Sequence, residues 1–536
     1  MQTQAQLQNE ITELKTLLQQ HKTLLKERDS LLKQREEEIK KLEALNKWYM
    51  EQLKLSRQKR FGVSSEAGKY DGFEQLNFFN EVEAESRPFT KEPDVEIITC
   101  QRRKKKGSRS AVLENLPVEV IEYKLPESGQ SCAKCGEPLH VMSTEIRKEL
   151  KVIPVQVSVV EHVKYIYACR NCQKNGIETP VVLAEAPEAL IPKSLVSPGL
   201  MAYIMNQKFV NAVPLYRQEQ EFRRLGVMLS RQNLSNWMIK GATLLEPILK
   251  RMKEELLRRD VLHADETTLE VLCEPGRPAQ TDSYMWVYRT SGDTAKPIVL
   301  YDYREGRSGK FAKEYLKGFS GYLHTDGWGG YHQLEGPGVT LCGCWAHMRR
   351  KFHEAQIACS KNEDSPEAVG LAYCNKLFAV EERARGLPAK ERYELRLKES
   401  KPIAEEFFKW VSRQIDNTLP QSLLGKALQY ALNQKKYLLA FLADGRIELS
   451  NNRAERSVKP FVIGRKNWLF CNTPGGAKSS AAIYSIIQTA IENGLKPQAY
   501  LEYVFLQIQL HGTGNIEALL PWAEEIPQIC RIPLSA

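Results

Sequence analysis

The stretch VLHADETTLEVL, residues 261–272, decides the fold of the largest part of this chain. Its apolar first half ends on Asp265 and Glu266, and its second half alternates as a half-buried strand does. The pattern predicts a β-strand that presents a carboxylate at Asp265. Because successive side chains of a strand point to opposite faces, Glu266 is expected to point away from any site at Asp265.

The segments that follow predict further strands and helices in a fixed order. They are SYMWVYRT (283–290), KPIVLYDY (296–303), the helical SGKFAKEYLKGF (308–319), GYLHTDGWGGY (321–331), VTLCGCW (339–345) and the helical AHMRRKFHEA (346–355). The motif H-x-D thus occurs in the first strand and again in the fourth, where it ends on Asp326. Three strands in a meander, followed by helices alternating with strands, are the order of a ribonuclease-H-like fold.

Four motifs resemble those of a known family. They are HADETTLEVL (263–272), YLHTDGWGGY (322–331), CWAHMRRKFHEA (344–355) and IELSNNRAERSVKPFVIGRKNWLF (447–470). Over nearly its whole length the chain resembles the DDE transposases of the insertion-sequence-66 family of bacterial insertion elements. The resemblance implies a multidomain α/β protein with a ribonuclease-H-like catalytic core at 255–475 and a helical C-terminal segment at 476–536. A charged, helical stretch at about 355–445 is expected to be an all-helical insertion in that core.

The two aspartates suit metal-dependent cutting of DNA. Phosphodiester chemistry of this kind uses two or three carboxylates around a pair of divalent ions about 4 Å apart. Mg²⁺ and Mn²⁺ prefer oxygen ligands. Asp265 and Asp326, at the ends of neighbouring strands, are therefore the first two candidate catalytic and metal-binding residues.

The third carboxylate is either Glu448 or Glu455. Asn451, Glu455 and Lys459 are spaced by four along a predicted helix and are expected to share one face. On that face the glutamate could meet metal while the lysine meets DNA phosphate. We favour Glu455, and the family's N-N-x-A-E-R motif, intact at residues 451–456, agrees with that choice.

Other residues near these carboxylates are assigned lesser roles. His263 and His324 are expected to pack beside the site rather than to bind metal. Arg349 and Arg350 lie in a motif that resembles the family's C-W-A-H-x-R-R-x-F, and we expect them to contact the DNA backbone.

Two more segments carry side chains suited to DNA. In 465–468, Arg465 and Lys466 adjoin Trp468, a combination that could grip DNA, although the tryptophan could equally anchor the end of the core. Residues 191–250 predict a helix-turn-helix with a break at Gly226 and a cap at Ser230, and an ordinary helical hairpin would look the same. Its candidate base-contacting residues are Arg231, Gln232, Asn233 and Asn236.

The N-terminal part predicts a long helix. Residues 1–60 contain no proline or glycine, and Ile11, Leu18, Leu25, Leu32 and Ile39 recur every seventh position. We expect a coiled coil that forms a homo-oligomer; packing of the helix on its own chain is the alternative. A linker at 61–115 follows, with the basic run QRRKKKGSR at 101–109.

Four cysteines predict a structural zinc site. Cys132, Cys135, Cys169 and Cys172 form two C-x-x-C pairs separated by a β-rich segment. Two such pairs can hold one Zn²⁺ tetrahedrally, as in a zinc ribbon. Four unrelated thiols would not account for the paired spacing, so a zinc-binding domain is expected at 116–190.

Composition limits the class of protein. The net charge of +10 over 536 residues suits a nucleic-acid partner without proving one. No segment has the pattern of a signal peptide or the length of a membrane span. We therefore expect a cytoplasmic bacterial protein without a membrane partner, whose cysteines bind metal rather than form disulfides.

The sequence as a whole predicts a DNA transposase. It is expected to bind the terminal inverted repeats of its element, cut at the ends with Mg²⁺ or Mn²⁺, and transfer the 3′-hydroxyl strands into target DNA. The family usually acts with small companion proteins of the same element. The alternatives are a catalytically inactive DNA-binding regulator and a ribonuclease-H-like nuclease.

Overall fold

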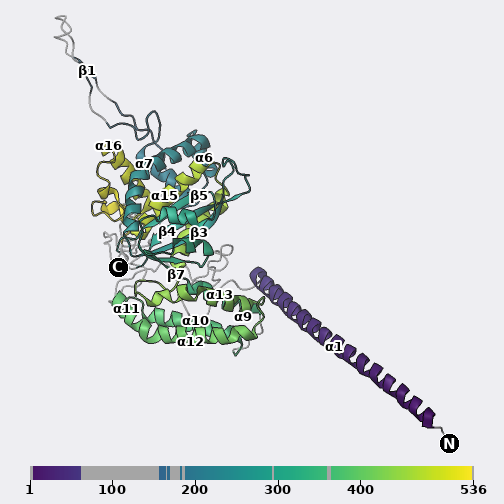
Figure 1. The fold of residues 1–536 in the computed structure, drawn as a ribbon. Helices are drawn as coiled ribbons and strands as arrows, with labels where there is room; N and C mark the ends of the chain where they lie inside the picture. The colour runs from purple at the N-terminus through teal and green to yellow at the C-terminus, as the bar shows by residue number, and fades with distance from the viewer. Residues whose placement is uncertain are drawn as a thin grey trace, which may run out of the picture. The chain divides into compact units, whose positions relative to one another are not determined.

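The computed structural model in Figure 1 describes residues 4–61, 156–163, 166–168, 181–183, 187–292, 295–358 and 364–533. They divide into two units. The first contains the described residues of 1–75, 252–462 and 470–474, and the second contains those of 76–251, 463–469 and 475–536. The basic linker and the four zinc-ligand candidates lie outside the described residues.

A five-stranded mixed sheet occupies the centre of the first unit. Its strands are β3 (Val261–Glu270), β4 (Asp282–Thr290), β5 (Val299–Arg304), β6 (Gly321–Thr325) and β7 (Val339–Gly343). Their order across the sheet is β5-β4-β3-β6-β7. The first three strands pair antiparallel, as the predicted meander requires, while β6 runs parallel to β3 and β7 parallel to β6.

The two H-x-D motifs lie side by side in this sheet. His263 of β3 pairs in register with His324 of β6. The first pair between these two strands joins Val261 to Tyr322. A Cβ on the preceding residue, Gly321, would lie 2.2 Å from the carbonyl oxygen of Asp260. The parallel pairing carries the two motifs in the same direction, so that both aspartates reach the same edge of the sheet.

Helices connect these strands. Helix α8 (Gly309–Tyr315) and the 3₁₀ helix η2 (Gly329–Leu334) lie between β5 and β7, and α9 (Trp345–Ala358) follows β7. Helix α8 is shorter than the predicted 308–319, and Ser308 takes the N-cap position without a side-chain cap. A glycine with φ of +93°, Gly318, follows the helix.

The insertion is helical throughout its described residues. Its elements are α10 (Pro366–Arg383), α11 (Ala389–Leu395), the π-helical turn η3 (Arg396–Ser400), α12 (Lys401–Gln414), η4 (Ile415–Asn417), α13 (Leu423–Leu438) and η5 (Ala440–Leu442). Figure 1 shows them with α9 as a layer beyond β7. Trp345 joins the two parts, because it packs on Phe407 at a ring distance of 5.3 Å and donates from Nε1 to the Leu438 carbonyl. Helix α14 (Asn452–Trp468) follows the insertion.

The second unit is mainly helical. It contains α5 (Pro198–Phe209), α6 (Leu215–Arg224), most of α7 (Arg231–Leu257), most of α15 (Pro474–Glu492), α16 (Pro497–His511), η6 (Glu517–Leu519) and η7 (Gln528–Cys530). Between α6 and α7, Gly226 has a φ of +84°, and the Ser230 hydroxyl accepts from the Asn233 amide at 3.2 Å. The expected turn and cap are therefore both present.

Three further elements precede α5 in the chain. Helix α1 spans Gln4–Phe61, close to the predicted 1–60. Strand β1 (Ile166–Ala168) pairs antiparallel with β2 (Val181–Leu183). In the part of the chain that the structure describes, no helix is long and apolar enough to cross a membrane.

Candidate active site

Asp265 lies in a concentration of negative charge. Its Oδ1 accepts a hydrogen bond from the Glu266 amide at 2.9 Å. Burial raises the pKa of the Asp265 carboxyl well above its usual value, and three neighbouring carboxylates raise it further. They belong to Glu266, Glu455 and Asp326. Mutual repulsion of this kind favours the binding of a cation, which would relieve it.

Asp326 is the first residue after β6. Its Oδ1 accepts from the Trp328 amide at 2.8 Å, which fixes the turn after the strand. Its other oxygen lies 3.6 Å from Nη2 of Arg307. Gly327 has a φ of +86° and lets the chain turn sharply there.

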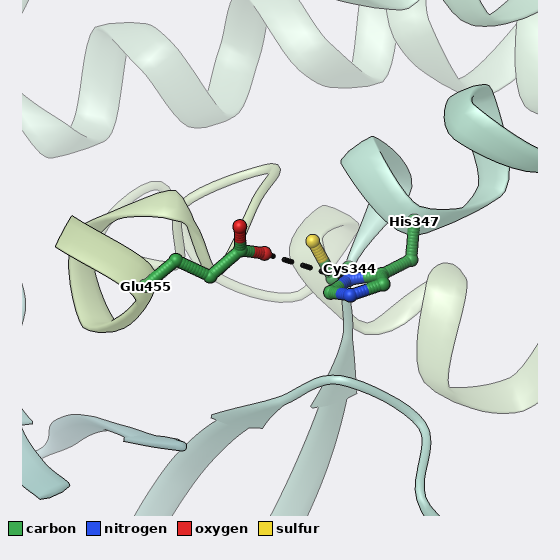
Figure 2. A group of neighbouring side chains, drawn as sticks. All are labelled: Cys344, His347 and Glu455. Carbon is green, nitrogen blue, oxygen red and sulfur yellow. Dashed lines mark ion pairs between the residues drawn. The ribbon is translucent and has the colours of Figure 1, made fainter. Parts of the chain in front are cut away.

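Glu455 enters the site from the first turn of α14. Figure 2 shows its carboxylate directed toward His347 of α9, with Oε1 lying 3.7 Å from Nδ1 of the imidazole. Oε2 lies 3.6 Å from Nη2 of Arg350. Oε1 is buried and has no hydrogen-bond partner among the described residues, so it is available to a cation.

Within the described residues, one group of three potential metal ligands has all its ligand atoms within 4.8 Å of one another. It consists of Cys344, His347 and Glu455 (Figure 2). The Cys344 thiol is an unsuitable ligand, because it accepts from the Asn451 amide at 3.1 Å and from the amides of Ala346 and His347. Burial also raises the pKa of this thiol to about 12. Cys344 is better explained as the cap of α9.

The three predicted carboxylates do not form such a tight group. The three carboxylates do not all have to bind the same ion. In a two-ion site the ions lie about 4 Å apart with metal–oxygen distances near 2.1 Å, so its ligand atoms are spread more widely than those of a single ion. The donor set of Asp265, Asp326 and Glu455 consists only of oxygens. It therefore fits Mg²⁺ or Mn²⁺ better than zinc.

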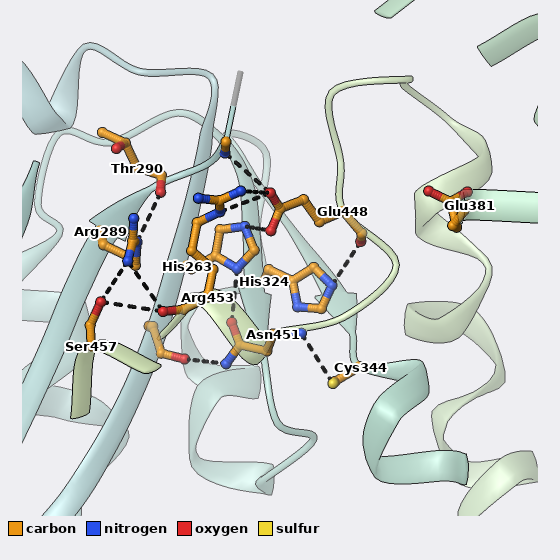
Figure 3. A network of polar contacts seen from close by, with 12 residues as sticks. His263, Arg289, Thr290, His324, Cys344, Glu381, Glu448, Asn451, Arg453 and Ser457 are labelled. Carbon is orange, nitrogen blue, oxygen red and sulfur yellow. Dashed lines mark hydrogen bonds and ion pairs between the residues drawn. The ribbon is translucent and has the colours of Figure 1, made fainter. Parts of the chain in front are cut away.

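Glu448 is held in a separate network, drawn in Figure 3. Its Oε1 accepts from Nε of Arg453 at 2.8 Å and from the Gly292 amide at 3.2 Å. Its Oε2 lies 3.5 Å from Nε2 of His263. Burial tends to raise the pKa of Glu448, but the nearby histidine and arginine outweigh it and lower the pKa to about 2.

The two histidines of the H-x-D motifs belong to this network. Their rings stack at 5.0 Å with an interplanar angle of 3°, and both are fully buried. His324 Nε2 lies 3.0 Å from the Glu448 carbonyl oxygen (Figure 3), and burial lowers the pKa of this histidine to about 3. Each histidine precedes its aspartate by two residues and so lies next to it on the same face of the strand. This is the arrangement expected of side chains that pack beside the site.

Asn451 differs from the expectation that it shares one helix face with Glu455 and Lys459. It precedes α14 and is fully buried, whereas the other two are half-buried. Its Oδ1 lies 2.9 Å from Nδ1 of His263, and its Nδ2 donates to the Ala264 carbonyl at 2.9 Å. It thus joins the start of α14 to β3.

Glu266 is not simply turned away from the site. Its Oε1 lies 2.6 Å from Nε of Arg307, and Tyr331 donates its hydroxyl to Oε2. Arg307 in turn reaches Asp326. The expectation that Glu266 lies apart from the site therefore needs correction, although its carboxylate is already engaged by these two partners.

The candidate DNA-binding residues occupy both units. Arg231, Gln232, Asn233 and Asn236 are exposed on the first turns of α7. Arg231 is also tied to α6, with Nε 3.1 Å from Glu219 Oε2 and the guanidinium over the Tyr216 ring.

The other candidate cations lie on α9 and α14. Arg350 is 44% exposed beside Glu455, but Arg349 donates to Asn375 of the insertion at 2.8 Å. Arg465 and Lys466 lie in the last turns of α14, within the second unit. Trp468 is half-buried there, with Lys208 over its ring at 5.9 Å.

Several residues of this site were missed in the sequence. Arg307, Tyr331 and Cys344 reach it from segments that are 41 to 107 residues away from their partners. Tyr331 and Cys344 at least lie inside recognisable motifs. Nothing in the sequence around Arg307 signalled a role.

Four family models match the chain. The model described as Transposase IS66 family matches residues 193–479, and a zinc-finger binding domain of the same transposase matches 130–173, which contain all four cysteine candidates. The IS66 C-terminal element matches 485–522. A model described as Transposase C of IS166 homeodomain matches 48–121.

Curated relatives come from Sinorhizobium fredii (strain NBRC 101917 / NGR234). The chain is 34% identical to uncharacterized protein y4qI, over 78% of this chain and 77% of the relative. It is 31% identical to uncharacterized protein y4jD, over 80% of this chain and 85% of the relative.

Proposed function

Because this chain belongs to the IS66 transposase family, we propose that it cuts DNA at the ends of its own element and joins the freed strands to target DNA. The observation that carries the proposal is the meeting of Asp265, Asp326 and Glu455 from three separate elements. The charges of Asp326 and Glu455 act on the Asp265 carboxyl, and all three side chains are half-buried. Isolated cap or turn carboxylates would not be gathered in this way.

The sheet is proposed to be a ribonuclease-H-like core. In support, an antiparallel meander is followed by two strands parallel to its first strand, in the order β5-β4-β3-β6-β7. Asp326 directly follows β6, whereas Asp265 lies within β3, the neighbouring parallel strand, and not at its end as the sequence predicted. The third carboxylate comes from the helix that closes the core after the insertion.

Asp265, Asp326 and Glu455 are the proposed ligands for Mg²⁺ or Mn²⁺. When bound, the ions would supply activation of the attacking oxygen and stabilisation of the leaving oxygen. Glu448 is less suited, because Arg453, the Gly292 amide and His263 already engage its carboxylate. His263 and His324 are proposed to support the strands that carry the aspartates.

DNA is proposed to contact several separated surfaces. The exposed polar residues at the start of α7 are proposed to meet base edges, and Arg350 beside Glu455 is proposed to meet phosphate. Three further basic residues on α14 are proposed to contact DNA: Lys459, Arg465 and Lys466. The zinc-finger domain, with Cys132, Cys135, Cys169 and Cys172 as proposed Zn²⁺ ligands, would add a further DNA-binding surface.

Assembly is proposed to depend on α1. Its heptad residues Leu18, Leu25 and Leu32 are 59%, 47% and 52% exposed in the single chain. Burying such a stripe against a second copy is favourable. Companion proteins of the same element are a further proposed requirement for activity.

A cutting assay tests this function against the two alternatives. The purified chain is incubated with a plasmid that carries the sequences flanking its gene, in Mg²⁺ or in EDTA. We expect Mg²⁺-dependent cuts confined to the element ends. Cutting without end specificity would favour a nuclease, whereas end binding without cutting, even after addition of the element's other products, would favour a regulator.

A further inference from the structure

Arg307 places a guanidinium group between two carboxylates of the proposed site. It lies in the loop between β5 and α8. Its Nε and Nη2 both lie 2.6 Å from Oε1 of Glu266, and Nη2 also lies 3.6 Å from Oδ2 of Asp326. One cation is therefore shared between Asp326, a proposed metal ligand, and Glu266.

The position of Arg307 is fixed by its surroundings. The guanidinium lies over the ring of Trp328 at 4.5 Å, two residues beyond Asp326. A Cβ on Gly309 would lie 1.9 Å from the Gly330 carbonyl oxygen. The loop of Arg307 thus packs backbone against backbone on the turn that follows Asp326, and the two cannot move far apart without breaking this contact.

The arginine is nevertheless open on one side. Its side chain is 37% exposed, whereas that of Glu266 is 1% exposed. No group among the described residues accepts a hydrogen bond from Nη1. A planar guanidinium with free donors is the side chain best suited to bind a phosphate.

The contact with Asp326 conflicts with cation binding there. A divalent ion on Asp326 would lie close to the guanidinium, and like charges at such distances repel strongly. Glu266 would still hold Nε. The Nη1 and Nη2 groups of Arg307 would then turn toward another anion. In a site with DNA bound, the nearest such anion is a phosphate of the DNA backbone.

We propose that Arg307 is a phosphate-binding residue of the cutting site, paired with both Glu266 and Asp326 in the metal-free chain and released from Asp326 to a DNA phosphate when Asp326 takes a cation. This inference rests on the proposed function. The competing explanation is a structural ion pair that only supports Glu266.

The test uses the full chain and a duplex of the terminal sequence that flanks its gene. Arg307→Gln is compared with Arg446→Gln, a matched control in which a 40% exposed arginine also pairs with two carboxylates, Asp260 and Asp444. DNA affinity is measured against salt concentration, once in EDTA and once in Ca²⁺, which takes the same oxygen ligands.

Each phosphate contact contributes about 0.9 to the slope of log affinity against log salt. In Ca²⁺, Arg307→Gln is expected to reduce this slope by about one. In EDTA the slope should equal that of the wild type, and Arg446→Gln should leave both slopes unchanged. Equal slopes for Arg307→Gln and the wild type in Ca²⁺ would overturn the proposal.

Metal binding without DNA gives an independent readout. Because Arg307 and the ion compete for Asp326, Arg307→Gln is expected to bind Mn²⁺ several-fold more tightly than the wild type. Weaker binding would mean that the arginine has a structural role. If the wild type binds Mn²⁺ and Asp326→Asn does not, the proposed metal site stands, and the failures named above concern Arg307 alone. If the wild type binds no Mn²⁺, both the proposed metal site and the role of Arg307 are overturned.

A second variant covers the case in which Arg307→Gln does not fold. Asp326→Asn removes one of the two carboxylates that Arg307 contacts without metal, and so is expected to raise the salt slope in EDTA by about one. Asp265→Asn also removes one negative charge but does not free Arg307, so it should leave the salt slope in EDTA unchanged. Equal slopes for these two variants would contradict the release of Arg307.

Discussion

At the scale of single residues, Asn451 connects three parts of the proposed site. Its side chain bonds to His263 and to the Ala264 carbonyl on β3, and its backbone amide donates to the Cys344 thiol at the cap of α9. Because α14 starts at the next residue, these bonds set the direction in which the helix presents Glu455.

Asn451→Ala is expected to lower both stability and cutting. The substitution leaves buried polar groups unpaired, which costs about 1–3 kcal/mol of unfolding free energy. Urea unfolding and end cutting are compared with Asn452→Ala, a half-exposed neighbour in the same motif. If the two variants behaved alike, Asn451 would have no special part in holding α14.

The lowered pKa of Glu448 predicts that the folded state loses stability in acid. Its pKa is about 2 in the folded chain, below its ordinary value of 4.5, so the folded state holds the charged form more strongly than the unfolded state. The stabilisation is present above pH 4.5 and is lost as pH falls toward 2.

We therefore expect Glu448→Gln to be less stable than the wild type at neutral pH, by about 3 kcal/mol for a broken buried pair. The difference should shrink as pH falls below 4.5. Urea unfolding at several pH values measures it, with Glu406→Gln on the exposed side of α12 as control. A difference that stayed constant down to pH 3 would argue against this ion pair.

The sequence predicted part of this site and missed another part for a clear reason. Asp265 and Asp326 could be found because each ends a local apolar run. Asn451 was expected to share a helix face with Glu455 and Lys459, because spacing along a predicted helix describes only that helix. Its true partner, His263, lies 188 residues away, and local patterns carry no information about such contacts.

At the scale of elements, the long α1 carries its apolar residues on the outside. Leu18, Leu25 and Leu32 are largely exposed along one side of a helix that buries none of them in the single chain. An isolated stripe of this length is unfavourable in water and favours association.

Replacing these three leucines by Asp is expected to convert an oligomer into a monomer in sedimentation equilibrium. The matched control places Asp at Thr16 and Thr23, which are exposed on the same helix outside the heptad stripe. An unchanged mass for the leucine variant would mean that α1 packs on its own chain or that assembly uses another surface.

Elements were more predictable than their ends. The strands and the helical insertion appear where periodicity and turn residues placed them, because apolar alternation reflects the side that each element buries. Helix α8 stops earlier than predicted, at Tyr315, although Leu316 and Phe319 are buried. An apolar pattern marks burial, and burial here continues beyond the helix.

At the scale of the whole molecule, the chain combines separate parts known from one transposase family. The matched zinc finger, main domain and C-terminal element follow one another from residue 130 to residue 522. The order of these parts was readable from motifs. Their chemistry depends on whether three carboxylates from distant segments act together.

The most direct measurement compares four carboxylate variants in Mg²⁺-dependent cutting at the element ends. Asp265→Asn, Asp326→Asn and Glu455→Gln are each expected to lower the cutting rate at least about 100-fold while end binding persists. Glu448→Gln, assayed at a temperature where it stays folded, should retain cutting. Cutting that survives Glu455→Gln but is lost in Glu448→Gln would contradict the proposed site.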